Sequence, residues 1–429
     1  MQKTVPNINL SPSKHKFYYW VNKSGDKLSI YSLIFIILLL PFDKIYIEIF
    51  RIHLNLPDII IVLYTILLTL RTLLIKNYSL FRPNSKVLYL GIVVLLFSIT
   101  MSSHLTGWNY SSLIYIFSIL AKLVLLFISF SVFRLGYHSI IVISFTYIIG
   151  ANIVSVYAII QYIQHLIHSS WSQISISGTF NNRNSMLFYL VPGVLMLFPY
   201  IFSSADKRYQ KLVFIKISAI IIPLTILFSR GRVGLVSLLL PSLPILYFYG
   251  KLKKSLVYIV AIISIPIVLI GKYYPPIAEE LISRYQSIIN INATINSEII
   301  QNTRILLYDT ALEFVRNNIW FGIGPGQFRG HSIIVNNIQL NAHNTFLGVL
   351  TELGIIGLFG FLLILLAGYI NVRSHYRYFN NEKILIVLLA IYSSCLFQSF
   401  FYDAIGLYQI WIFLGACLGV SKKSVTYKY

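Results

Sequence analysis

The chain alternates between long apolar runs and short polar segments. A transmembrane helix needs about 20 mostly apolar residues, and most of these runs reach or approach that length. The pattern predicts an all-α integral membrane protein with about 12 transmembrane helices. The predicted spans are roughly residues 28–41, 58–75, 87–103, 111–133, 139–163, 184–203, 212–228, 233–249, 255–271, 344–370, 384–401 and 405–420. The first run is short, so about 11 spans is the alternative count.

One connection, residues 272–343, is much longer than the others. Loops of this length usually carry function. Within it, the spacing of apolar residues over 304–316 predicts an amphipathic helix, and Asn302 or Thr303 is its predicted cap. The glycine-rich stretch 322–326 predicts a tight, irregular turn.

Composition agrees with a membrane protein and excludes a soluble one. The chain is 57% hydrophobic and 11% charged, whereas soluble domains contain about 25% charged residues. No polar stretch is long enough to form a separate domain. The predicted organisation is therefore a tail (1–27), nine spans (28–271), a long external loop (272–343), three spans (344–420) and a second tail (421–429).

The net charge of +21 is distributed unevenly between the two sides of the membrane. With the amino terminus in the cytoplasm, the inner segments hold 23 of the 34 Lys and Arg residues, and the outer loops hold ten basic and nine acidic residues. Cytoplasmic loops carry such an excess of Lys and Arg. This predicts that both termini are cytoplasmic and that residues 272–343 are outside. The charge is thereby explained without a nucleic-acid partner.

The two cysteines and the first 27 residues do not change the prediction of a membrane protein. Cys395 and Cys417 lie within late apolar runs and give no disulfide or metal-site pattern. The first 27 residues are polar and lysine-bearing, without a short apolar core or a cleavage site, so we expect a tail before an uncleaved first span.

Three of the basic residues on the predicted outer face stand out as candidate site residues. Arg230 ends the seventh span, Arg304 lies in the predicted first turn of the loop helix, and His343 stands with Asn344 at the mouth of the tenth span. A helix N-terminus favours an anion near Arg304. The simpler interpretation is that an arginine at a span end is an interfacial anchor and that a lone histidine is structural.

Three acidic or basic residues need separate mention. Lys122 and Glu352 lie within predicted spans, where an ionisable group is functional or paired by default. Asp403, between the last two spans, is either a site residue or an ordinary loop acid.

Several motifs along the chain resemble the shared domain of the O-antigen ligase and polymerase superfamily. They occur in the same order on a similar topology, from residue 174 to 364. The motifs are Gly178-Thr179-Phe180-Asn181-Asn182-Arg183-Asn184, Ser229-Arg230-Gly231-Arg232, Arg304 with Tyr308, Gly322-Ile323-Gly324-Pro325-Gly326-Gln327-Phe328, His343-Asn344-Thr345-Phe346-Leu347 and Glu352-Leu353-Gly354-Ile355-Ile356-Gly357-Leu358.

The resemblance implies a GT-C-like fold and transfer of a glycan from an undecaprenyl-diphosphate carrier to an acceptor, outside the plasma (inner) membrane of a bacterium. It implies that Arg230 and Arg304 hold the diphosphate and that His343 is the catalytic base. The supporting residues would be Asn344, Glu352, Asn184 and Asp403.

The chemistry is reasonable on its own terms. Paired guanidinium groups neutralise the charge that grows on a leaving diphosphate, and a neutral histidine removes the proton of a sugar hydroxyl. The outer face offers no Asp-x-Asp pair and no His/Cys cluster, so we predict no metal and no cofactor.

The sequence leaves the acceptor open. A ligase would deliver the glycan to a lipid A core, and a polymerase would deliver it to another lipid-linked glycan in O-antigen, capsule or exopolysaccharide synthesis. The alternatives are a protein O-oligosaccharyltransferase and a small-anion transporter. Sugar specificity and oligomeric state also stay open, and His331 is the competing base in the same loop.

Overall fold

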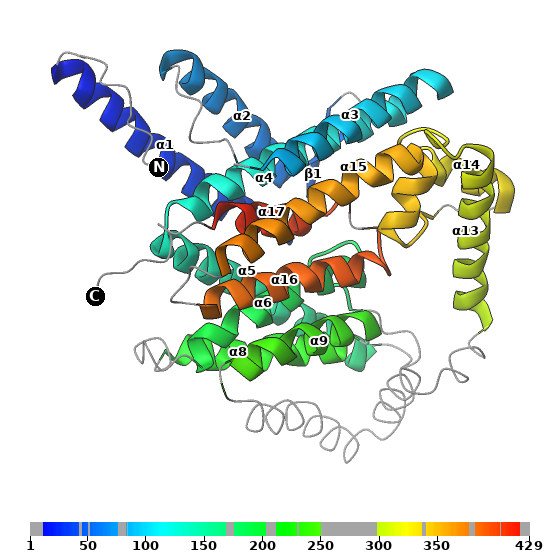
Figure 1. Ribbon diagram of the computed structural model, residues 1–429. Coiled ribbons are helices and arrows are strands. Elements are labelled where there is room, and N and C mark those ends of the chain that lie inside the picture. The colour runs from blue at the N-terminus through cyan, green and yellow to red at the C-terminus, as the bar shows by residue number, and fades with distance from the viewer. Residues whose placement is uncertain are drawn as a thin grey trace.

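The computed structural model describes residues 12–42, 45–49, 52–75, 83, 85–168, 176–202, 212–229, 231–248, 250, 298–336, 340–376, 382–403 and 405–420. Over these ranges the chain is helical apart from one two-stranded hairpin (Figure 1). The elements are α1 (Pro12–Leu39), β1 (Tyr46–Ile49), β2 (Ile52–Asn55), α2 (Leu56–Ile75), α3 (Lys86–Thr106), α4 (Tyr110–Arg134), α5 (Tyr137–His168), α6 (Arg183–Phe202), α8 (Val213–Phe228), α9 (Arg232–Phe248), α13 (Glu298–Asn317), α14 (Phe328–Asn336), α15 (Thr345–Tyr376), α16 (Glu382–Ser399) and α17 (Tyr408–Gly419).

Five helices in the described ranges are long and apolar enough to cross a bilayer, namely α3, α4, α5, α6 and α15. Five shorter apolar helices accompany them, among them α8, α9 and α17. The predicted class, a helical membrane protein with several spans, is therefore confirmed. The count of about 12 spans and the GT-C-like fold stay predictions, and the predicted ninth span, 255–271, lies outside the described residues.

Two features were not predicted. Helix α1 begins at Pro12, inside the predicted tail. Residues 46–49 and 52–55, between the first two predicted spans, form an antiparallel hairpin in which Tyr46 pairs with Asn55. Short strands of alternating apolar and polar residues give a weak signal beside long apolar runs, which explains the omission.

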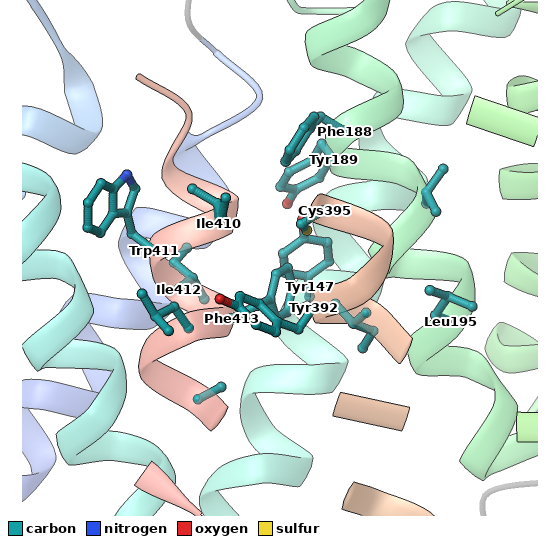
Figure 2. Packing of buried hydrophobic residues seen from close by; sticks show 14 of the residues in the cluster. Tyr147, Phe188, Tyr189, Leu195, Tyr392, Cys395, Ile410, Trp411, Ile412 and Phe413 are labelled. Atoms are coloured by element: carbon teal, nitrogen blue, oxygen red, sulfur yellow. The ribbon is translucent and has the colours of Figure 1, made fainter. Parts of the chain in front are cut away.

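Aromatic side chains join the helices at the centre of the core (Figure 2). The rings of Tyr147 on α5 and Tyr189 on α6 stack at 4.6 Å between centroids. The Tyr189 hydroxyl donates to the Ile37 carbonyl on α1 at 2.9 Å, and the Tyr392 hydroxyl donates to the Leu365 carbonyl at 2.8 Å. Buried hydroxyls need such partners where water is absent. These bonds fix neighbouring helices against one another.

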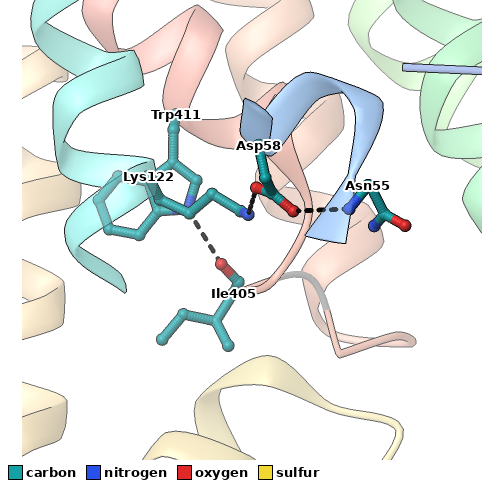
Figure 3. A network of polar contacts seen from close by, with 5 residues as sticks. All are labelled: Asn55, Asp58, Lys122, Ile405 and Trp411. Carbon is teal, nitrogen blue, oxygen red and sulfur yellow. Dashed lines mark hydrogen bonds and ion pairs between the residues drawn. The ribbon is translucent and has the colours of Figure 1, made fainter. Parts of the chain in front are cut away.

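The cation within a predicted span, Lys122, is held by other residues of the bundle. Its Nζ lies 3.7 Å from Asp58 Oδ1 at the start of α2 (Figure 3) and 3.7 Å from the centre of the Tyr408 ring on α17. Trp411 Nε1 donates to the Ile405 carbonyl at 3.0 Å. Pairing lowers the cost of burying a charge. These contacts also hold the segment between α16 and α17 on the bundle.

Helix α15 is broken at Gly354, where the backbone angles are φ 68° and ψ −172°. The amide groups of Ile323 and Gly324 donate to the carbonyls of Thr351 and Glu352, at 2.9 and 3.1 Å. The amide of Ile355 donates to the Ile319 carbonyl at 2.9 Å. The glycine-rich turn therefore occupies the break and satisfies the backbone groups that the interruption exposes.

Two serines of α3 donate hydrogen bonds to backbone carbonyls at the break in α15. Ser98 Oγ donates to the Leu353 carbonyl at 2.7 Å, and Ser102 Oγ donates to the Glu352 carbonyl at 3.0 Å. Helices α3 and α15 lie side by side along much of their length (Figure 1). Irregular backbone is tolerated at membrane depth only where its polar groups find such partners.

The predicted loop helix is real but longer than expected. Helix α13 begins at Glu298, so Asn302 and Thr303 lie within it and do not cap it. The predicted end at Asn317 is confirmed. The structure also contains α14, which the sequence pattern did not predict, and it lies near α13 at one end of the bundle (Figure 1).

Candidate functional site

A polar cavity of about 440 Å³ lies where α6 and α14 begin and where the segments before α15 and before α17 meet. It brings together three predicted site residues that are far apart in the sequence: Asn184, His343 and Asp403. The other lining residues are Asn182, Arg183, Arg329, Leu340, Asn341 and Tyr402.

The first wall of the cavity is the start of α6. Asn182 Oδ1 accepts from the Ser185 amide at 2.9 Å and so caps the helix. The Asn182 Nδ2 group donates to the Tyr402 hydroxyl at 2.7 Å, and Ser185 Oγ lies 3.1 Å from the same hydroxyl. The side chain of Tyr402 is thus fixed between α6 and the cavity.

His343 has a left-handed backbone, with φ 51°. It is the only described residue other than glycine with a positive φ, and such a conformation in a non-glycine residue often marks a functional site. Two neighbouring residues hold it in place. Asn344 Oδ1 caps α15 by accepting from the Leu347 amide at 3.0 Å, and Thr345 Oγ1 donates to the Tyr402 carbonyl at 2.8 Å.

The imidazole of His343 is suited to act as a base. Its Nδ1 atom is buried and has no hydrogen-bond partner among the described residues. Burial lowers the pKa of His343, and the positive charge of Arg304 lowers it further. A lowered pKa keeps the ring neutral at pH 7, and the neutral ring is the form that accepts a proton.

Asp403 lines the cavity from the segment before α17. Its Oδ2 accepts from Asn341 Nδ2 at 3.0 Å. Burial raises the pKa of Asp403 to about 6, although hydrogen bonds from the Ile405 amide and from Asn341 act in the opposite direction. Asp403 therefore lines the candidate cavity, and its role as a supporting site residue stays a prediction.

Arg304, on α13, is near enough to His343 for its charge to act on the imidazole ring. It does not line the cavity. The predicted position in the first turn of a helix was wrong, because α13 begins at Glu298. The positive end of α13 therefore does not assist Arg304. Arg230, the other predicted diphosphate ligand, lies outside the described residues.

A protein-family model matches the part of the chain that contains Arg304 and His343. Residues 217–362 match a family model described as O-antigen ligase. We refer to residues 217–362 as the O-antigen ligase domain on the basis of this similarity. The resemblance read from the motifs is thereby confirmed. No curated protein matches the chain.

The O-antigen ligase domain contains the predicted residues Arg230, Arg304, His343 and Glu352. Asn184 and Asp403 lie outside the matched segment on either side, and the fold brings both to the cavity. The cavity therefore combines residues of the matched segment with residues on both sides of it.

Glu352 does not line the cavity. Its Oε1 accepts from the Phe328 amide at 3.2 Å, and the Gly326 amide also donates to its carboxylate. The described partners of this intramembrane carboxylate are therefore backbone amides, and its role as a supporting site residue stays a prediction. Glu352 therefore ties α15 to the start of α14, which carries Arg329.

The competing base, His331, is also absent from the cavity lining. It lies in α14, where its Nδ1 is 3.0 Å from the Gln327 carbonyl. Its ring packs edge-on against Phe314 at 5.6 Å between centroids. These contacts give His331 a structural role.

Sequence reasoning missed several lining residues. Arg183 lay within a quoted motif, beside Asn184, and Asn341 lies two residues before His343, so their positions carried a signal that was not used. Tyr402 precedes Asp403, and Arg329 follows a quoted motif directly. Over the described ranges, no group of three or more His, Cys, Asp and Glu residues is placed to hold a metal ion. The predicted metal independence stays a prediction.

Proposed function

We propose that the chain transfers a glycan from an undecaprenyl-diphosphate carrier to the hydroxyl group of an acceptor, with His343 as the base. The observation that carries the proposal is the position of His343, which lies in a polar cavity and is within reach of the charge of Arg304. Such a transfer requires a base that can reach the acceptor hydroxyl and a positive charge near the leaving diphosphate.

In the proposed reaction, the acceptor oxygen attacks the anomeric carbon of the donor sugar while His343 removes the hydroxyl proton. The bond between that carbon and the phosphate oxygen breaks, and undecaprenyl diphosphate leaves with the electron pair. Arg230 and Arg304 neutralise the charge that develops on the diphosphate, in the role that a metal ion fills in other enzymes. A single displacement inverts the anomeric carbon, and no cofactor is needed because the donor is already activated.

The acceptor class that the family description favours is that of a ligase, with a lipid A core as acceptor. A polymerase acting on a second lipid-linked glycan fits the same site. A protein O-oligosaccharyltransferase is the alternative within this chemistry. In each case we propose that the site faces the outside of a bacterial inner membrane and that both termini are cytoplasmic, on the basis of the charge distribution along the loops.

A small-anion transporter is the alternative from another class. It would need a charged path through the bundle. Lys122 is engaged by Asp58 and Tyr408 rather than by a polar cavity, which argues against that path.

The test uses the purified full chain with a lipid-linked donor. Arg304→Ala and Arg304→Lys should both reduce donor binding and transfer, because a point charge does not replace a guanidinium fork. Arg316, exposed on the same helix, supplies the matched control Arg316→Ala, which should keep both activities. Normal transfer by Arg304→Lys would contradict the assigned role, and loss of transfer with EDTA would contradict the metal-free reaction.

A further inference from the structure

Two arginines that the proposed mechanism does not use, Arg183 and Arg329, line the same cavity as His343. Arg183 begins α6 and is half-buried, and its Nη1 donates to the Ser229 carbonyl at 3.4 Å. Arg329 is exposed at the cavity rim in the first turn of α14. Its guanidinium has no ion pair or hydrogen bond with another described residue. Guanidinium groups bind phosphates and carboxylates in two-pronged geometry.

The surrounding backbone adds to this positive potential. The cavity lies at the N-terminal ends of α6 and α14 and beside His343, which precedes the cap of α15. Each of these ends is capped by a carboxylate or an amide oxygen, from Asn182, Glu352 or Asn344. The helices therefore contribute the positive charge of their ends rather than open donors.

One carboxylate also lines the cavity. Asp403 accepts hydrogen bonds from Asn341 Nδ2 and from the Ile405 amide. Among the described lining residues, two guanidinium groups stand beside this single acid, which favours binding of an oxyanion. The remaining polar lining, with three asparagines and Tyr402, is suited to sugar hydroxyls. The volume of about 440 Å³ is that of a small-molecule site.

The oxyanion has two sources, the donor diphosphate and an acidic group on the acceptor. The acceptor hydroxyl has to reach His343, and His343 faces this cavity. Arg304, assigned to the diphosphate under the proposed function, lies outside the lining.

We infer that this cavity is the acceptor subsite and that Arg183 and Arg329 select an acceptor sugar bearing a carboxylate or phosphate group. The inference rests on the proposed function for the roles of His343 and Arg304. It adds a substrate class, an acidic acceptor sugar, that the family description does not supply.

The experiment measures binding of simple probes to the full chain in lipid nanodiscs. The probes are methyl glucuronide, methyl glucoside 6-phosphate and the neutral methyl glucoside, each also as the galacto epimer, observed by saturation-transfer NMR. The acidic probes should bind at least about tenfold more tightly than the neutral ones. Arg329→Gln should remove most of that preference, and Arg316→Gln, the matched control on α13, should keep it.

A second arm measures binding of undecaprenyl diphosphate to the same proteins. Arg329→Gln should leave it unchanged. Equal binding of acidic and neutral probes, or a preference that survives in both Arg329→Gln and Arg183→Gln, would overturn the inference. Loss of undecaprenyl diphosphate binding in Arg329→Gln would assign the oxyanion to the donor and would also overturn it. Failure of the donor assignment has a different signature, because Arg304→Ala would then bind undecaprenyl diphosphate normally.

Discussion

Replacing Gly354 with alanine tests whether the break in α15 organises the site. At φ 68° and ψ −172°, the backbone of this residue is in a region that only glycine adopts readily. An added Cβ would also overlap the Trp320 carbonyl of the docked turn. The substitution therefore forces the turn away from α15 or makes α15 refold as a continuous helix.

The cost follows from the contacts at the break. The backbone strain amounts to about 1–3 kcal/mol. Displacement of the turn also removes the bonds from the Ile355 and Ile356 amides to the carbonyls of Ile319 and Trp320, at 2.9 and 3.5 Å. At about 0.5–1.5 kcal/mol for each bond, the total loss is about 2–6 kcal/mol.

The assay is thermal unfolding of the purified protein in detergent, with transfer measured in parallel. Gly354→Ala should lower the apparent Tm by several degrees and strongly reduce transfer, because the displaced turn leads directly into α14 and Arg329. The matched control is Gly348→Ala in the same helix, where no heavy atom lies within 4 Å of the added Cβ. It should keep or slightly raise the Tm, because alanine is the better helix former. An unchanged Tm in Gly354→Ala would refute the role of the break.

Three further predictions address other parts of the account. Because the pKa of His343 is lowered by burial and by Arg304, its neutral form persists below pH 6.5, the ordinary value. Transfer should therefore stay near its maximum as the pH falls past 6.5 and decline only in more acid buffer; a profile already halved at pH 6.5 would contradict this. Glu352→Ala should lower both Tm and transfer by releasing the Phe328 amide, with Glu352→Gln intermediate, and an alanine variant equal to the wild type would rule this tie out. A reporter fused after Lys254 should be cytoplasmic and one inserted near Asn292 external, so reporters on one side would disprove the orientation.

Much of the site was predictable from residue type and order alone. Asn184 and His343 were named from the family motifs, and Asp403 was named as an acid between the last two predicted spans. The fold brings all three to one cavity. What the sequence did not reveal was how they meet. The bond from Asn182 to the Tyr402 hydroxyl joins residues 220 positions apart, and no local pattern encodes such a contact.

The break in α15 shows a similar limit. Residues 345–376 are apolar enough to predict one continuous span, and glycine is common within membrane helices. The interruption is stable because the Gly322–Gly326 turn and two serines of α3 supply partners from elsewhere in the chain. The start of the loop helix was also predicted too late. Its amphipathic pattern weakens before residue 304, whereas α13 itself begins at Glu298.

The central claim is that His343 is the base of a glycan transfer. The most direct measurement compares His343→Ala with His331→Ala in purified protein supplied with an undecaprenyl-diphosphate-linked glycan and an acceptor, and records donor binding and transfer separately. His343→Ala should bind the donor and transfer almost nothing, because it lacks only the group that removes the hydroxyl proton, whereas His331→Ala should remain active. Transfer by His343→Ala together with inactivity of His331→Ala would contradict the account.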